Sequence, residues 1–498
     1  MLYCSYDLFT SLSRVWNFTT DDAYISWVYA RHWVDGEGLI WHPQLPIVEG
    51  FSNFLWTAIA ALVLLLKLPL VNTMKVIAIG CLMAGLMALY RLARLFFSPL
   101  LAILPVFIFS HYIGSVWWTL KGLETPLYVT LSIVLAWQVL KAWGYAEENQ
   151  RKEWSTLAWF FTNISLLALS LTRFEGLIWI IPILFFAGCQ FKHRQFPKQS
   201  MVYSWGFISL LCFILPYTAY FIWRIAYFGH WIPNSYQCKA MAQGQFFLVD
   251  WDYFEVLLPF LVASLPYLIV SRDCRQLLLW LPSLLYALLL WKANPVISHF
   301  IRLFLAPFAL FSLLPVLGVL EFSSYFRLKI DSKLLTSLVI FLITVLFSQG
   351  NEPNYLEKSV HHYQERTQNR LDVASLLNQK AKKGASVLLG DCGLIPYMAR
   401  KDLRFVDSQC LNNAEITQEP YKDHLDLYAK HLKREIKPDW LIINFYPLEQ
   451  HGDSLDVLLK KEDFFEDYQL VRTLKSGFNS DDSGEKIIDY VYKVYRRK

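Results

Sequence analysis

Long apolar stretches dominate the first 347 residues of the chain, and mixed polar and apolar residues dominate the rest. The apolar runs between 71 and 347 have lengths that suit membrane-spanning helices, whereas Lys, Asp, Glu and Asn occur throughout the chain after Gln349. The pattern predicts an α-helical polytopic membrane protein with a C-terminal soluble α/β domain. Its expected parts are an N-terminal segment with a first outer loop (1–50), a multi-span membrane domain (51–348) and the soluble domain (349–498). Ten spans are expected, at residues 72–92, 96–118, 126–143, 156–171, 176–190, 203–223, 254–270, 276–291, 303–320 and 334–347.

Positive charge distinguishes the two sides of this predicted membrane domain. Lys and Arg gather in every second connection between spans, and cytoplasmic loops carry such an excess. The remaining connections, and with them the C-terminal domain, are therefore expected outside the cytoplasm. The basic residues are Arg91 and Arg94; Lys141, Arg151 and Lys152; Lys192, Arg194 and Lys198; Arg272 and Arg275; and Arg327, Lys329 and Lys333.

The apolar run at residues 51–70 breaks this alternation if it crosses the membrane. We therefore expect it to lie in or dip into the outer interface, which Trp56, Lys67 and Pro69 tolerate. Something should then bring the chain outward before Asp21, yet residues 1–20 make a poor spanning helix. Either the first helix is degenerate or the start codon is misplaced. These residues also lack the basic segment and apolar core of a cleavable signal peptide.

Composition narrows the function classes. Of the 498 residues, 55% are hydrophobic and only 17% are charged, whereas soluble proteins carry about 25% charged residues. The net charge of +5 is spread over short loops, so a nucleic-acid partner is excluded. The eight cysteines show no CxxC or paired Cys/His spacing that would indicate zinc or an iron–sulfur cluster. Cys189 and others in apolar runs are expected as small core residues, and Cys392 and Cys410 are the disulfide candidates.

Two adjacent carboxylates, Asp21 and Asp22, stand just outside the predicted membrane. Neighbouring carboxylates raise one another's pKa, so one could act as a general base, or the pair could hold a divalent cation. The alternative is that both cap a helix over residues 23–34, because a helix N-terminus favours acidic groups. Spacing alone leaves both hypotheses open, and the sequence requires no cofactor.

Further charged and polar residues border the same outer face. Arg and Lys there suit a phosphate group, with Arg as a planar fork and Lys as a point charge. The alternatives are an Arg173–Glu175 pair that neutralises itself and an aromatic belt with cations reaching to the interface. The candidates are Arg173, Lys239 and Arg302 for a phosphate, and Glu124, Glu175, Asn234 and Tyr236 for other substrate groups.

Three motifs in the first outer loop carry a family resemblance. They are Asp-Asp-Ala-Tyr-Ile-Ser-Trp-Val-Tyr-Ala-Arg at 21–31, Gly-Glu-Gly-Leu-Ile-Trp-His-Pro at 36–43 and Val-Glu-Gly-Phe-Ser-Asn-Phe-Leu-Trp at 48–56. They resemble the opening of bacterial GT-C-fold membrane glycosyltransferases, in particular the mycobacterial terminal arabinofuranosyltransferase branch and a related Legionella protein of lipopolysaccharide loci. Segments 122–125, 171–176, 227–239 and 302–307 continue the pattern in order. The stretch 292–299 lacks the Gly-Gly-Asp of that branch, so arabinose is not carried over.

The resemblance implies an integral enzyme of the bacterial inner membrane with a periplasmic C-terminal domain. Such an enzyme takes a sugar from a polyprenyl-phosphate donor and places it, with inversion, on an outward-facing glycan or glycolipid of the cell envelope, such as lipopolysaccharide. An acidic residue of the first loop is the family's proposed base, which corresponds to Asp21 first and Asp22 second. Arg173, Lys239 and Arg302 would bind the donor phosphate.

Two other classes remain as alternatives. A transporter or flippase of lipid-linked sugars would explain many helices with charged rims, but we find no internal repeat and no charges at mid-membrane positions. A scaffold without catalysis would tolerate Asn at 21 and 22. In the tail, the periodicity predicts a helix at 371–383 and strands at 386–389, 440–445 and 487–495.

Overall fold

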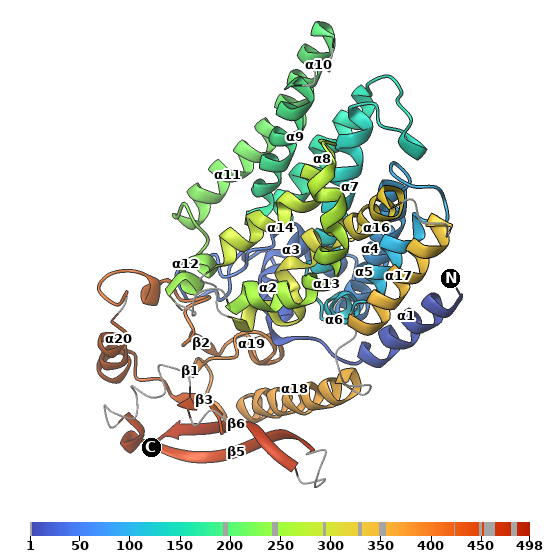
Figure 1. Cartoon of the computed structure of the whole chain (residues 1–498). Coiled ribbons are helices and arrows are strands. Elements are labelled where there is room, and N and C mark those ends of the chain that lie inside the picture. The colour runs from blue at the N-terminus through green and yellow to red at the C-terminus, as the bar shows by residue number, and fades with distance from the viewer. Residues whose placement is uncertain are drawn as a thin grey trace. The chain divides into compact units, whose positions relative to one another are not determined.

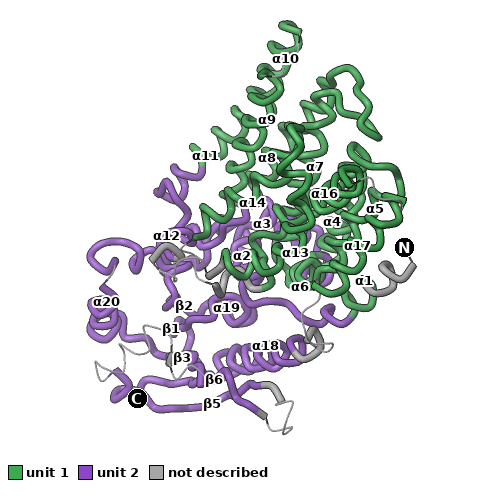
Figure 2. The backbone as a smooth tube through the Cα atoms, in the orientation of Figure 1, with its two compact units in different colours: residues 1–13, 74–223, 243–353 green, residues 14–73, 224–242, 354–498 purple. Residues whose placement is uncertain are grey.

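The computed structural model describes residues 2–192, 198–241, 248–291, 295–326, 331–347, 355–422, 424–447, 451–452, 464–479 and 486–498. It divides into two compact units, drawn in different colours in Figure 2. The first comprises Met1–Ser13, Met74–Trp223 and Gln243–Pro353, and the second Arg14–Thr73, Arg224–Ala242 and Asn354–Lys498. The second unit thus gathers three distant stretches of the chain. The predicted boundary at 348/349 falls outside the described residues.

The first unit is helical (Figure 1). Apart from α1 (Leu2–Val15) and the polar turn η1, its helices overlap the predicted apolar runs. In chain order they are α4 (Leu70–Ala93), α5 (Ile103–His111), α6 (Ile113–Leu120), α7 (Thr125–Ala142), η1 (Glu147–Asn149), α8 (Thr156–Thr172), η2 (Phe174–Trp179), α9 (Ile180–Lys192), α10 (Gln199–Ser209), η3 (Leu210–Ile214), α11 (Leu215–Phe228), α13 (Leu248–Val270), α14 (Gln276–Leu290), η4 (Pro295–Phe304), α15 (Leu305–Phe311), α16 (Leu313–Tyr325) and α17 (Ser332–Phe347).

Six helical stretches among the described residues are long and apolar enough to cross a membrane: Leu70–Ala93, Thr125–Ala142, Phe174–Lys192, Gln199–Phe228, Asp250–Val270 and Phe300–Tyr325. The pair α5 and α6 would add a seventh, although it is bent by 64°. The predicted spans at 156–171, 276–291 and 334–347 fall on shorter apolar helices. The chain is a multi-pass membrane protein, and the figure of ten crossings stays a prediction.

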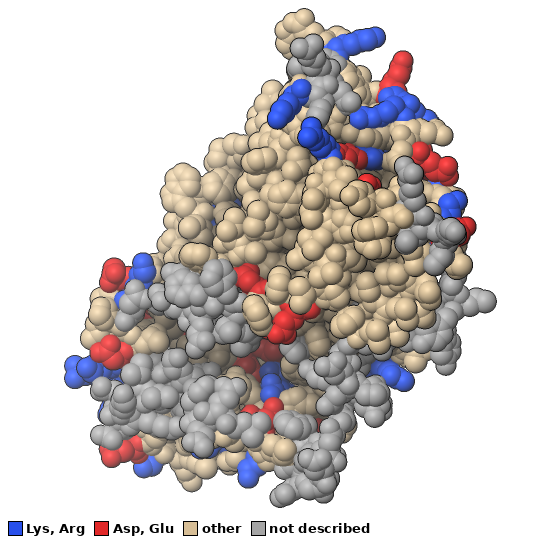
Figure 3. Space-filling view, in the orientation of Figure 1, with Lys and Arg blue, Asp and Glu red and all other residues tan. Residues whose placement is uncertain are grey.

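Charge is distributed unevenly over the first unit. Lys and Arg side chains, with Asp and Glu among them, gather at the end that carries α10, and the surface beside them is largely free of charged side chains (Figure 3). A helix-lined surface without charge is what contact with lipid requires. The distribution therefore agrees with basic loops on one side of an apolar band.

The second unit combines helices of the first loop with a C-terminal sheet. Its elements are α2 (Asp21–Val34), α3 (Phe54–Leu65), α12 (Asn234–Met241), α18 (Tyr355–Lys380), β1 (Ser386–Leu389), α19 (Leu394–Met398), β2 (Arg404–Asp407), η5 (Ala414–Thr417), α20 (Leu425–His431), η6 (Leu432–Ile436), β3 (Trp440–Tyr446), β4 (His451–Gly452), η7 (Phe464–Asp467), β5 (Tyr468–Asn479) and β6 (Lys486–Arg497). Helix α3 has 12 residues, about 18 Å of length, so it is shorter than the roughly 30 Å hydrocarbon layer. Its expected place in the interface stays a prediction.

The sheet has the order β2-β1-β3-β6-β5, with β4 paired to β3. Strands β2, β1 and β3 run parallel, and β6 is antiparallel to both β3 and β5. Side chains alternate between two cores, as a strand covered on both faces requires. Val387, Leu389 and Ile442 face one core, and Leu388 and Leu441 face the other. The predicted strands at 386–389 and 440–445 correspond to β1 and β3.

Two disulfides correct the predictions for cysteine. Cys410 is bonded to Cys238 on α12, whereas Cys392 is a buried free thiol. Cys189, expected as an unpaired core residue, is bonded to Cys274. Periodicity along the chain carries no signal for either pair, because the partners lie 172 and 85 residues apart.

Replacing Cys238 by Ser is expected to destabilise the second unit by about 2–5 kcal/mol, because the disulfide closes a long loop in the unfolded chain. Thermal unfolding under non-reducing conditions measures the loss, and Cys212→Ser, at a partly buried free thiol, is the matched control. Peptide mapping without reductant should recover Cys238 joined to Cys410. A Cys392–Cys410 peptide, or free thiols at both 238 and 410, would contradict this pairing.

Candidate functional site

A buried group of charged side chains occupies the helix ends of the first unit; we call Lys121, Glu124, Arg173, Glu175 and Arg302 the arginine cluster. Glu124 precedes α7 and makes no capping bond to that helix. Its Oε1 instead accepts from Arg173 Nη1 at 3.0 Å and from Arg302 Nη2 at 3.3 Å. Arg173 Nε also donates to Glu175. Four predicted site residues from three separate segments therefore come together.

Local backbone structure brings Arg173 into this group. Ser155 begins α8 by accepting a hydrogen bond from Ala158 N at 3.1 Å. Helix α8 ends at Thr172, and Arg173 follows in an extended conformation before η2 begins. The guanidinium therefore leaves the helix axis and reaches Glu124 and Glu175.

Aromatic rings hold the cations of the arginine cluster. Lys121 Nζ lies 4.1 Å from the ring centroid of Trp117 and 4.2 Å from that of Trp118, and the Arg302 guanidinium lies 4.9 Å from Trp118. The arginine side chains are only 12% and 13% exposed. Among these five poorly solvated side chains, the cations outnumber the carboxylates by three to two. An anionic ligand would stabilise these cations, because little water reaches them.

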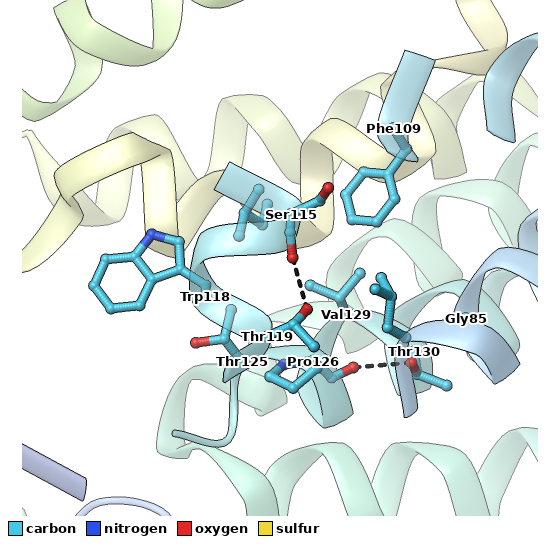
Figure 4. Close-up of a pocket in the computed structure, with 11 residues that line it drawn as sticks. Gly85, Phe109, Ser115, Trp118, Thr119, Thr125, Pro126, Val129 and Thr130 are labelled. Carbon is cyan, nitrogen blue, oxygen red and sulfur yellow. Dashed lines mark hydrogen bonds between the residues drawn. The ribbon is translucent and has the colours of Figure 1, made fainter. Parts of the chain in front are cut away.

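Trp118, whose ring contacts Lys121 and Arg302, also lines a small cavity (Figure 4). Its volume is about 10 Å³, room for roughly one water molecule. Thr119 donates to Ser115 O at 2.6 Å along its wall. The buried Thr125 hydroxyl has no hydrogen-bond partner among the described residues. The cavity therefore suits a single water molecule and is too small for a sugar.

The aspartate pair begins α2 in the second unit, and its two members have different surroundings. Asp21 accepts from Gly393 N at 3.0 Å and Leu394 N at 2.8 Å, whereas Asp22 is exposed. The helix N-cap is Thr20, so neither aspartate caps α2 as the alternative interpretation supposed. Both still lie in its first turn, where the helix dipole favours negative charge.

Burial governs the protonation of Asp21. It raises the pKa of this carboxyl to about 6, while Arg370 opposes the rise and Asp391 adds to it. Burial would also raise the pKa of Asp391, but Arg370 and the Tyr492 and Tyr490 hydroxyls outweigh it and lower that pKa. Within the described part of the chain, no three His, Cys, Asp or Glu side chains are grouped so as to hold a metal ion. A divalent cation at the pair stays a prediction.

The remaining predicted residues lie on α12 in the second unit. Asn234 donates to Cys410 O at 2.6 Å and Leu411 O at 3.0 Å, and its Oδ1 accepts from Thr417 at 2.6 Å. These bonds occupy its buried amide. Tyr236 is partly buried. The side chain of Lys239, also on α12, lies outside the described residues, as do the side chains of residues 292–299.

Sequence reasoning missed Arg370 and its contact with Asp391. Arg370 lies on the buried face of α18, where polar residues replace the apolar period by which helices are recognised. The available signal was the repetition of basic side chains at 366 and 370, one helical turn apart.

Comparison with known proteins identifies solved structures that have a similar fold. The model of a family described as a domain of unknown function (DUF8728) matches residues 358–495. Among curated proteins, none matches the sequence. The structure of ArnT from Cupriavidus metallidurans bound to undecaprenyl phosphate is 11% identical, with a TM-score of 0.57, and the match covers 99% of this chain and 96% of that one. An Archaeoglobus fulgidus oligosaccharyltransferase tethered to an acceptor peptide is 12% identical, with a TM-score of 0.55, and the match covers 98% of this chain and 74% of that one.

Both of these proteins are GT-C-fold glycosyltransferases. This chain has the GT-C fold. The fold class expected from the first-loop motifs is confirmed, including the C-terminal domain with its sheet. At 11–12% identity the GT-C likeness establishes architecture alone. The narrower similarities to the mycobacterial branch and to a Legionella protein stay predictions.

Proposed function

We propose that this protein is a membrane glycosyltransferase. It moves a sugar from a polyprenyl-phosphate donor to a cell-envelope glycan or glycolipid on the outer face of the inner membrane. The observation that carries the proposal is the arginine cluster, in which two poorly exposed guanidinium groups meet at one buried carboxylate at the ends of apolar helices. A lipid-linked phosphate would bring negative charge to such a place while its chain remains in the bilayer.

The donor phosphate is the group that the cluster suits best. Arg173 and Arg302 offer planar forks that match phosphate oxygens, and Glu124 orients both guanidinium groups. As the bond between the anomeric carbon and the phosphate oxygen breaks, the departing phosphate takes the electron pair and gains charge, which nearby cations stabilise. The ArnT structure of the same fold holds undecaprenyl phosphate, which supports this donor class. Lys239 remains a proposed third cation.

The acceptor hydroxyl needs a base that takes its proton. We assign this role to Asp22, because its carboxylate is exposed whereas both oxygens of Asp21 accept backbone hydrogen bonds. Asp22 takes the proton of the acceptor hydroxyl as that oxygen bonds to the anomeric carbon and the phosphate leaves. A single displacement of this kind inverts the configuration. Tyr236 remains a proposed acceptor contact, whereas the Asn234 amide is already bonded to Cys410, Leu411 and Thr417.

The charges of the loops support a side of the membrane for the reaction, and that side in turn supports a class of acceptor. Basic residues mark the cytoplasmic connections, so the first loop and the C-terminal domain are proposed to be periplasmic. Glycans completed on that face include lipopolysaccharide and other surface polysaccharides. We propose one of these as the acceptor.

Changing Arg173 or Arg302 to Lys tests the phosphate site. Each variant keeps the charge and loses the fork, and should lower the initial rate of sugar transfer by about 10–10²-fold. Transfer from a lipid-linked donor in detergent, with a parallel melting curve, measures the effect. Arg91→Lys is the matched control, because Arg91 is 54% exposed and forms only a surface pair. Equal rates of transfer in all three variants would mean that the arginine cluster has no role in the reaction.

A further inference from the structure

Helix α2 shares a hydrophobic core with the C-terminal sheet, although the two are far apart in sequence. Val28 and Tyr29 of α2 are buried in the same cluster as Leu389 of β1 and Ile442 of β3. The Tyr29 hydroxyl donates to Val48 O at 2.8 Å and accepts from Gly50 N at 3.0 Å. The domain of unknown function therefore packs around a helix from the opposite end of the chain.

Two charged side chains of α2 bind the two ends of α19. Asp21 accepts the free backbone N–H groups of Gly393 and Leu394 at the start of α19. Arg31 donates to Tyr397 O at 2.6 Å near its end, and the guanidinium lies 4.9 Å from the Tyr397 ring centroid. Negative charge thus meets the N-terminus of α19 and positive charge its C-terminus, as the helix dipole favours.

Arg370 on α18 joins this contact to the sheet. Its Nε lies 2.8 Å from Asp391 Oδ2 and 3.4 Å from Asp21 Oδ1. Asp391 in turn accepts from Tyr490 at 3.0 Å and Asn444 at 3.1 Å, and also from Tyr492. Arg370 is 8% exposed, so the bridge is shielded from water. One guanidinium therefore connects α2, through Asp21, to a carboxylate fixed by β3 and β6.

We infer that the C-terminal domain positions α2 for catalysis and that Arg370 is the positioning residue. The Asp21–Arg370–Asp391 bridge and the α19 contacts fix the first turn of α2, and Asp22 is the next residue of that turn. A base must lie within hydrogen-bond reach of the proton it removes, so small displacements of this turn lower the rate. The catalytic part of this inference rests on the proposed function, whereas the docking of α2 does not.

Hydrogen–deuterium exchange of the full-length protein in detergent tests the docking without any activity. Arg370→Met should raise amide exchange in α2 at least 10-fold relative to the native chain, and Arg370→Lys should give an intermediate increase. Arg472→Met is the matched control, because Arg472 is 46% exposed and forms an outer pair with Asp372. If α2 exchanges alike in Arg370→Met and Arg472→Met, the docking role is wrong.

Gly393→Ala provides a second variant that removes no charge. A Cβ at 393 would collide with the Asp21 backbone carbonyl, so α2 and α19 must separate. This variant should also raise amide exchange in α2, and it tests the docking even if Arg370→Met fails to fold.

Kinetics then test the catalytic part. In Arg370→Met, kcat should fall at least 10-fold while KM for the lipid-linked donor changes by less than about 2-fold, because the bridge acts on the base. Raised exchange with an unchanged kcat would overturn the positioning role. A native chain without transferase activity would refute the proposed function and leave the exchange result to decide the docking.

Discussion

Replacing Asp22 by Asn is expected to lower the rate of sugar transfer by about 10²–10⁴-fold, because the acceptor hydroxyl loses its base. Asp22 is exposed on the first turn of α2, so the same change should cost at most about 1 kcal/mol of stability, the contribution of its charge to the helix dipole. Initial rates and thermal unfolding of the purified variant measure both effects.

Asp21→Asn is the companion variant, and its expected result differs. The two carboxylate oxygens accept one bond each from Gly393 N and Leu394 N, and in the amide one of these oxygens is replaced by an NH2 group that would face a backbone N–H donor. We expect lower activity together with a lower melting temperature. Native activity in Asp22→Asn would contradict the assignment of Asp22 as the base. If Asp21→Asn were stable and inactive while Asp22→Asn stayed active, the base would be Asp21.

Breaking the Glu49–Arg224 pair should cause a large loss of stability in the second unit. Glu49 Oε1 and Oε2 accept from Arg224 Nε at 2.9 and 2.7 Å, and the side chains are 5% and 2% exposed. Arg224→Met leaves the carboxylate buried without its counter-charge, which costs about 3–5 kcal/mol. Thermal or denaturant unfolding measures this change.

Two controls accompany the Arg224 variant. Lys401→Met breaks the exposed Lys401–Asp35 pair and should cost no more than about 1 kcal/mol. The double variant Arg224→Met with Glu49→Gln should be more stable than the sum of the two single changes predicts, because it leaves no unpaired buried charge. Strict additivity would mean that the two side chains do not stabilise each other.

The apolar pattern predicted most helices of the first unit because lipid-facing and core helices both require continuous apolar residues. It also predicted β1 and β3, whose short buried runs are typical of central parallel strands. The expected helix at 371–383 is only the C-terminal part of α18, Tyr355–Lys380. The part of α18 before residue 371 is polar, and its Arg366 and Arg370 face Asp489 and Asp391 instead of an apolar core.

The candidate site was predictable in part. Arg173, Glu124, Glu175 and Arg302 were all named from their positions at helix ends, and they meet in one cluster. The difference between Asp21 and Asp22 could not be predicted. It depends on Gly393, Leu394 and Arg370, more than 340 residues away, and no local pattern specifies such contacts.

The most direct test of the central claim is transfer in detergent solution. Cells that lack this protein supply a lipid extract with the unused donor and an envelope fraction with the unmodified acceptor. Purified native protein is added, and mass spectrometry follows the envelope glycan. We predict that the glycan gains one defined sugar with native protein and not with Asp22→Asn. A transporter needs two membrane sides and would transfer nothing in detergent, so an unchanged glycan would contradict the account.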